Sequence, residues 1–230
     1  MHPLLAGLRD FIFPQFCPVC AEHLETDESL CEHCRVHLPA MFLPVCEICG
    51  KQLPADRECY DCGGKGERAW DSRRALFHYT DAVASIVHEC KFNQNRTLLH
   101  YLAAMVCTSF YTYYDPEKID MVIPMPLSKT RFAQRGYNQA EELCRYLNDH
   151  VNTDVLVRVK NTKVQSLIHN AEKRAHNVKG AFTVTRDIAG KRIVLFDDVI
   201  TTGATTNSAA VQLKEAGAVE VHLFALSMAG

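Results

Sequence analysis

The chain has 230 residues, 47% hydrophobic content and a formal net charge of −2, which suits one ordinary domain plus a small module. The near-neutral balance excludes a protein that binds polyanions over its whole surface, and no stretch approaches the roughly 20 apolar residues of a membrane span. The charge is uneven, however. Residues 17–71 carry 11 acidic and 5 basic side chains, whereas the residues from Arg73 onward carry 15 acidic and 19 basic ones.

Residues 1–16 carry apolar side chains at helical spacing, from Leu4 to Ile12. Arg9 and Asp10 interrupt this run, no Lys or Arg precedes it, and no small-residue cleavage site follows it. We therefore expect a short helix packed on its own protein rather than a signal peptide. We also expect an intracellular, cytoplasmic setting, in which cysteines stay reduced unless a metal holds them.

Eight of the eleven cysteines form four Cys-x-x-Cys pairs between residues 17 and 62. This spacing lets two thiolates from one tight turn reach a tetrahedral zinc ion. A disulfide framework would need an oxidising compartment, and an iron–sulfur cluster usually shows a tighter third spacing. The pattern predicts two structural Cys₄ zinc sites, and either neighbouring or alternate pairs could share a metal. The predicted ligands are Cys17, Cys20, Cys31, Cys34, Cys46, Cys49, Cys59 and Cys62.

The cysteine-rich segment is predicted to form a module of its own over residues 1–71, followed by a larger domain over residues 72–230. So short a segment has little core, so zinc would supply most of its folding free energy. Its net acidic charge disfavours phosphate contacts, which indicates a scaffold or protein-contact role rather than the main nucleic-acid surface. Cys90, Cys107 and Cys144 stand alone on predicted helices and are expected in the core.

From Arg73 onward, predicted strands alternate with predicted helices. This order indicates an α/β fold, a parallel sheet with helices on both faces, whose ligands collect at the carboxyl ends of the strands. The predicted strands span 75–79, 121–123, 155–159, 181–184, 193–196 and 219–226. The predicted helices span 81–90, 97–113 and 138–148, and a further helix follows Gly203.

A basic loop, residues 124–137, follows the strand at 121–123. Prolines stiffen its entry, cationic side chains concentrate in its middle, and Gly136 is expected to open the next helix. A strand-end loop with cations and backbone donors can hold a diphosphate, although alone the loop could also be a solvated basic turn. The residues assigned to it are Met125, Pro126, Leu127, Lys129, Arg131, Arg135 and Gly136.

A second basic segment runs over residues 158–179, with six basic residues against one acid. Its first half lacks clear periodicity, so we expect a mobile loop that closes over a ligand and carries Lys163 and Arg174.

The stretch RIVLFDDVITTGAT, residues 192–205, combines a buried strand, two carboxylates and a small hydroxyl-and-glycine turn before a helix. The free N–H groups at a helix start attract a phosphate, and a glycine lets the backbone bend around it. The two carboxylates can accept hydrogen bonds from sugar hydroxyls or lie close to Mg²⁺. A solvated acidic turn with capping threonines is the alternative for a lone acidic pair. The residues of this turn are Thr201, Thr202, Gly203, Ala204 and Thr205.

The run VLFDDVITTGAT resembles the phosphoribosyl pyrophosphate (PRPP) loop of type I phosphoribosyltransferases. The resemblance implies that Asp197 and Asp198 hold the ribose 2′- and 3′-hydroxyls and act as catalytic residues. It implies that residues 201–205 hold the 5′-phosphate, that Mg²⁺ accompanies PRPP, and that a flap of the kind expected at 158–179 covers the sugar.

Over nearly the whole chain, four Cys-x-x-Cys pairs, IPMP…RGYNQA, VQSL…KRAHNVKGAF and the PRPP loop resemble the ComF family of competence proteins, an arrangement that GntX-like proteins share. The resemblance implies a zinc-ribbon module on a phosphoribosyltransferase domain that acts in natural transformation. It also implies a cytoplasmic role in handling incoming single-stranded DNA, with a helicase-like partner.

Three functions are consistent with these motifs. The first is a DNA-uptake protein that binds PRPP-like groups and single-stranded DNA, for which Lys129, Arg131, Arg135 and Tyr137 offer cations beside aromatic rings. The second is an active phosphoribosyltransferase with an unknown acceptor, and the third is a regulator that senses PRPP. A fold alone does not establish activity.

Overall fold

The structure, a computed structural model, describes residues 14–24, 28–54, 59, 62, 68–93, 95–160 and 180–229. The predicted N-terminal helix and most of the predicted mobile loop, including Lys163 and Arg174, lie outside these residues. In the described part of the chain, no helix combines the length and apolar character that a membrane crossing requires.

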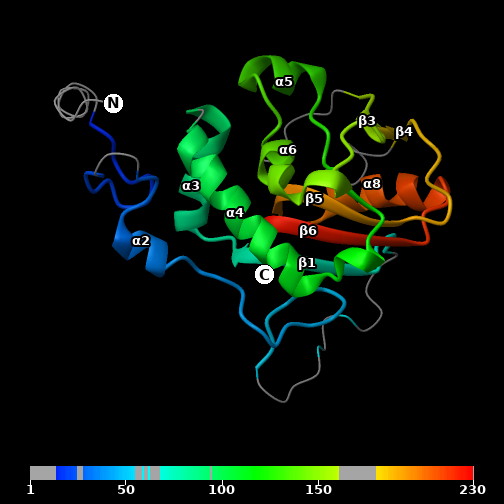
Figure 1. Cartoon of the computed structure of the whole chain (residues 1–230), viewed down its shortest axis with the longest axis horizontal. Coiled ribbons are helices and arrows are strands. Elements are labelled where there is room, and N and C mark those ends of the chain that lie inside the picture. Colours follow the sequence, from blue (N-terminus) through cyan, green and yellow to red (C-terminus); the bar gives the residue numbers. More distant parts are fainter. Residues whose placement is uncertain are drawn as a thin grey trace.

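The central sheet has four strands: β1 (Ser72–His78), β2 (Met121–Pro124), β5 (Arg192–Ile200) and β6 (Glu220–Met228). They lie in the order β1-β6-β5-β2, and every neighbouring pair is parallel. Figure 1 labels β1, β6 and β5, which lie side by side in this order. Ile193 of β5 is opposite Met121 on one side and Val221 on the other. The predicted parallel sheet is therefore confirmed, with the apolar run of residues 193–196 at its centre.

Alternate residues of β5 separate the two faces of the sheet. Val194 and Phe196 join the core formed with one set of helices, whereas Ile193 and Leu195 join the core on the opposite face. The first face is covered by α3 (Asp81–Phe92), α4 (Arg96–Tyr113) and α6 (Gln139–Cys144), and the second by α8 (Ala204–Glu215) with a small two-stranded sheet. Cys90 and Cys144 are buried as predicted, and Cys107 is partly exposed.

The predicted strands at 155–159 and 181–184 form, but they do not join the parallel sheet. They appear as β3 (Leu156–Arg158) and β4 (Phe182–Val184), which pair antiparallel as a separate two-stranded sheet. Leu156 and Phe182 pack against the same core as α8. Their burial satisfies the apolar pattern without a place in the central sheet.

The predicted loop 124–137 is wrong in its second half, which is the helix α5 (Lys129–Arg135). The Ser128 side chain accepts a hydrogen bond from Arg131 N–H and so caps the helix start. Gly136 ends α5 in the left-handed region, at φ 76°, and does not open the next helix. The Asn138 side chain caps α6 instead, and the chain continues after α6 as the 3₁₀-helix η3 (Arg145–His150).

The described part of the N-terminal segment covers the outer edge of β1. Ala40 forms an antiparallel bridge with Phe77, and Arg73 N–H donates to the Ile48 carbonyl. Gly50, at φ 68°, lies so close to β1 that a Cβ atom there would be 2.1 Å from the Arg73 carbonyl oxygen. At the other edge, β2 is covered by residues 151–152. The part of the chain that the structure describes also contains the short helices α2 (Glu32–Val36) and η2 (Pro116–Lys118).

Candidate functional site

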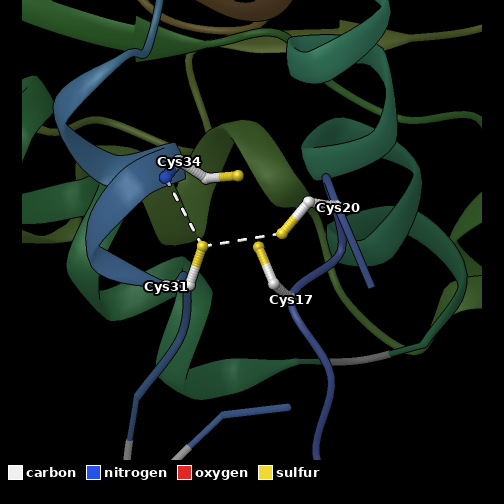
Figure 2. Close-up of side chains that lie close together, drawn as sticks. All are labelled: Cys17, Cys20, Cys31 and Cys34. Carbon is white, nitrogen blue, oxygen red and sulfur yellow. Dashed lines mark hydrogen bonds between the residues drawn. The ribbon is translucent and has the colours of Figure 1, made fainter. Parts of the chain in front are cut away.

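The first cysteine cluster joins Cys17 and Cys20 with Cys31 and Cys34 (Figure 2). The first two lie in a turn, and α2 begins directly after Cys31, whose sulfur accepts a hydrogen bond from Cys34 N–H at 3.4 Å. The Cys20 and Cys31 sulfurs are 3.5 Å apart. All four sulfurs lie within 4.8 Å of one another.

The second cluster joins Cys46 and Cys49 with Cys59 and Cys62, again within 4.8 Å. The Cys46 and Cys62 sulfurs are 3.4 Å apart, and the Cys49 and Cys59 sulfurs are 3.6 Å apart. Neighbouring Cys-x-x-Cys pairs therefore share each site, which settles a point that the sequence left open.

Both clusters have the donor set and the size that zinc requires. A tetrahedral ion with Zn–S bonds of about 2.3 Å separates its sulfur ligands by about 3.8 Å, close to the spacings within each cluster. His23, His33 and His37 are exposed beside this segment, as expected if the thiolates complete each site.

The second cluster is held against the large domain by arginines of β1. Arg73 Nε donates to the Cys49 carbonyl at 3.0 Å, and Arg74 donates to the carbonyls of Cys46 and Glu47. These bonds use backbone oxygens and leave the sulfurs for a metal. The position of the cluster is thus fixed relative to the sheet.

The acidic pair lies near the carboxyl end of β5, the central strand. Asp197 Oδ1 accepts a hydrogen bond from Asp198 N–H at 2.9 Å. Burial raises the pKa of Asp197 to about 7, and the nearby charge of Asp198 adds to this increase while Lys91 opposes it. Asp198 itself forms an ion pair with Lys91, at 2.8 Å between Oδ2 and Nζ.

Both aspartates line a cavity of about 250 Å³, which also receives Thr201 and Thr205 from the turn after β5. Gly203, at φ 74°, precedes the first residue of α8, and the left-handed conformation favours glycine there. The helix start therefore lies beside the acidic pair, as the sequence predicted. Thr202, Gly203 and Ala204 do not line the cavity.

Basic side chains surround the same cavity. The described residues that line it include four cations and two carboxylates, a formal balance of +2 when both carboxylates are ionised. Arg135 reaches it from the end of α5 and donates to Gln139 Oε1 at 2.8 Å. The cations are Lys91, Arg131, Arg135 and Arg158.

The remaining predicted loop residues divide between two cavities. Met125, Pro126 and Leu127 line the first cavity. Lys129 lines a neighbouring cavity of about 300 Å³, which shares Pro126, Leu127, Asn138 and Arg158 with the first. Tyr137 is half-buried, and its hydroxyl donates to the Cys90 carbonyl. Gly136 serves as the end of α5 and has open space around its Cα.

Sequence reasoning did not assign Lys91, Tyr79, Asn138, Gln139 or Arg158 to the site, although all five line the first cavity. Arg158 belonged to the predicted mobile segment, but it lies at the end of β3 with its guanidinium 5.4 Å from the Phe182 ring. Asn138 and Gln139 are within the quoted run RGYNQA, so that run carried a signal for them. Lys91 had no comparable signal.

A magnesium ion on the acidic pair would compete with Lys91 for one of the carboxylate oxygens. Asp198 Oδ2 already holds the Lys91 ammonium, which a metal ion bound to that oxygen would have to displace.

Two protein-family models match the chain: a double zinc ribbon domain over residues 8–63 and a phosphoribosyl transferase domain over residues 114–228. Together with the parallel sheet and the cysteine clusters, these matches define a phosphoribosyltransferase-type protein with a double zinc ribbon. The chain belongs to the ComF family of competence proteins.

The first two of the following relatives show this membership, and the third is similar to the chain over most of its length. Competence protein F of Haemophilus influenzae is 32% identical over 225 residues, which cover 86% of this chain and 96% of that protein. Competence protein ComFC of Bacillus subtilis is 30% identical over 236 residues, which cover 98% and 95%. DNA utilization protein YhgH of Escherichia coli K12 is 25% identical over 217 residues, which cover 91% and 88%.

Proposed function

We propose that this protein handles incoming single-stranded DNA in the cytoplasm during natural transformation, and that its phosphoribosyltransferase-type domain binds PRPP or a related phosphorylated ribose. One observation carries the proposal: an acidic pair, two threonines on either side of the start of α8 and four cations line a single cavity. The relatives named for competence and DNA utilization give the setting.

The first part of the proposal concerns the sugar phosphate. Asp197 and Asp198 offer carboxylate oxygens for sugar hydroxyls, while Thr201 and Thr205 with the start of α8 offer donors for a 5′-phosphate. Arg131 and Arg135 line the same cavity and supply positive charge for a diphosphate. Any Mg²⁺ that accompanies PRPP is expected on the diphosphate oxygens of the ligand.

The second part concerns DNA. Arg135 lies 5.6 Å from the centre of the Phe92 ring, and 61% of Phe92 is exposed. Phe132, on α5 beside the second cavity, is 51% exposed. Exposed aromatic rings among arginines suit unpaired bases, since each stacked base contributes about 1–3 kcal/mol. We expect a DNA strand to pass along α5, and a helicase-like partner to deliver it.

An active phosphoribosyltransferase is the second candidate, because the same acidic pair and cationic loop could stabilise the departure of diphosphate from C1 of PRPP. A third is a PRPP-sensing regulator. Turnover of PRPP against a panel of bases and amines separates the transferase from the other two, because only a transferase releases diphosphate in proportion to acceptor consumed.

The test of the sugar-phosphate site is the double variant Asp197→Asn/Asp198→Asn. We expect PRPP at about 100 times its Kd to stabilise the wild-type protein by roughly 2.7 kcal/mol, a thermal shift of about 5–10 °C. The double variant should lose this shift but keep its zinc content and its circular dichroism spectrum. Asp81→Asn removes an exposed carboxylate at the start of α3 and should keep the full shift. An unchanged shift in the double variant would overturn the assignment.

A further inference from the structure

Lys91 forms an ion pair with the acidic pair. It belongs to the last turn of α3, and its ammonium lies 2.8 Å from Asp198 Oδ2. The Lys91 side chain is 21% exposed and that of Asp198 is 15% exposed, so solvent screens this ion pair less than a surface pair. Lys91 is 107 residues away from Asp198 in the chain and lies outside the PRPP-loop motif.

The backbone that carries Lys91 is fixed on both sides. The preceding residue, Cys90, is buried, and its carbonyl accepts a hydrogen bond from the Tyr137 hydroxyl. The following residue, Phe92, lies below the Arg135 guanidinium. The core side of α3 packs in the same apolar cluster as Cys17, Cys31 and Cys34 of the first cysteine site. The ammonium is therefore delivered by an anchored helix end.

Two adjacent carboxylates in a partly buried site need a counter-charge. Lys91 already provides a positive charge at Asp198 Oδ2, where a divalent metal would have to compete with the ammonium. The other cations of the cavity, Arg131, Arg135 and Arg158, are long side chains suited to phosphate oxygens. Lys91 thus supplies locally what a metal would otherwise supply.

We infer that Lys91 is the built-in counter-cation of the acidic pair, and that the sugar-phosphate part of the ligand binds without a divalent metal. This inference rests on the proposed function, namely that the cavity takes a phosphorylated ribose. Lys91 acts as a positioning residue. It holds the Asp198 carboxylate in place for a sugar hydroxyl and neutralises it, so that the anionic phosphate can approach.

Ribose 5-phosphate is the probe, because it lacks the diphosphate that would bring its own magnesium. Its binding to the full zinc-loaded chain is measured calorimetrically in metal-free buffer and then with MgCl₂, without chelators that would remove zinc. We expect the wild-type Kd to change by less than about twofold. Lys91→Met should weaken binding about tenfold or more without magnesium, as expected for loss of a charged hydrogen bond. Magnesium should restore part of that loss.

Two further variants complete the test. Lys91→Arg keeps the charge and should stay independent of magnesium, whereas Lys118→Met removes a surface lysine that pairs with Asp115 and should match the wild type. Wild-type binding that requires magnesium would overturn the inference while leaving the proposed function standing, and so would unchanged metal-free binding by Lys91→Met. Failure of the wild type to bind either ribose 5-phosphate or PRPP under any condition would overturn both. If Lys91→Met does not fold, the wild-type and Lys91→Arg comparisons still decide the question.

Discussion

The partly buried carboxylate of Asp197 predicts a measurable dependence of stability on pH. Its pKa is raised from 3.8 to about 7, so the folded state holds this proton more tightly than the unfolded chain does. The stabilising effect of the bound proton is complete below about pH 4 and is lost as the pH rises to about 7. Asn mimics the protonated acid and removes this loss. The increase of about three pKa units corresponds to about 4 kcal/mol of pH-dependent stability. This value is an upper limit, because solvent in the cavity reaches the side chain.

The assay is thermal unfolding of the wild-type protein and Asp197→Asn at about pH 6 and pH 8.5, both zinc-loaded and free of ligand. We expect Asp197→Asn to be the more stable protein, by a margin that grows by about 1 kcal/mol or slightly more between the two pH values. For a chain of this size the margin should grow by roughly 2–4 °C in Tm. Asp81→Asn, the exposed control, should show no such trend. Parallel changes in wild type and Asp197→Asn would refute the burial argument.

Three further outcomes are expected. Arg135→Ala should weaken single-stranded DNA binding and reduce the salt slope by about 0.7, the contribution of one phosphate contact. Arg145→Ala, which removes an arginine at the C-terminal end of α6 that lines neither cavity, should change neither quantity. Equal slopes for all three proteins would exclude Arg135 from the DNA path. Gly50→Ala should destabilise the protein by clearly more than Gly190→Ala. Both glycines have positive φ, but only at Gly50 would a Cβ atom meet backbone atoms. The Gly190 variant therefore measures the cost of positive φ alone, about 1–2 kcal/mol. The wild type should release two zinc ions per chain in a colorimetric assay and Cys34→Ser only one, and a full count in that variant would argue against its role as a ligand.

The central strand and the turn after it could be predicted because their signals are local. The run of residues 193–196 has no polar alternation, and Gly203 precedes a helical pattern. The same rules could have found α5, since Ser128 and Gly136 are ordinary start and stop residues for a helix. The basic side chains between them indicated a diphosphate-binding loop instead, and α5 has no buried residue whose apolar spacing would have marked a helix.

Lys91 could not be predicted, because its role depends on a contact between α3 and β5, two elements far apart in the sequence. Nothing in its neighbourhood distinguishes it from a lysine at any helix end, where a cation is favourable for local reasons. Only the packing of α3 beside β5 brings its ammonium to Asp198. The assignment of the Cys-x-x-Cys pairs to the two metal sites was open for a similar reason. Four similarly spaced pairs permit either arrangement until the backbone path is known.

The cover on the outer edge of β1 has a consequence for the protein when zinc is scarce. A bare edge strand presents unpaired N–H and C=O groups that can template pairing with another copy. The β1 edge is masked by the residues around Ala40 and Ile48, which the second cysteine cluster anchors through Arg73 and Arg74. Zinc starvation would loosen that cover while the opposite edge stays masked by residues 151–152. A molecule with one exposed edge strand can pair with one other copy but cannot extend into a fibril. A zinc-deprived preparation should therefore show dimers before it shows precipitate.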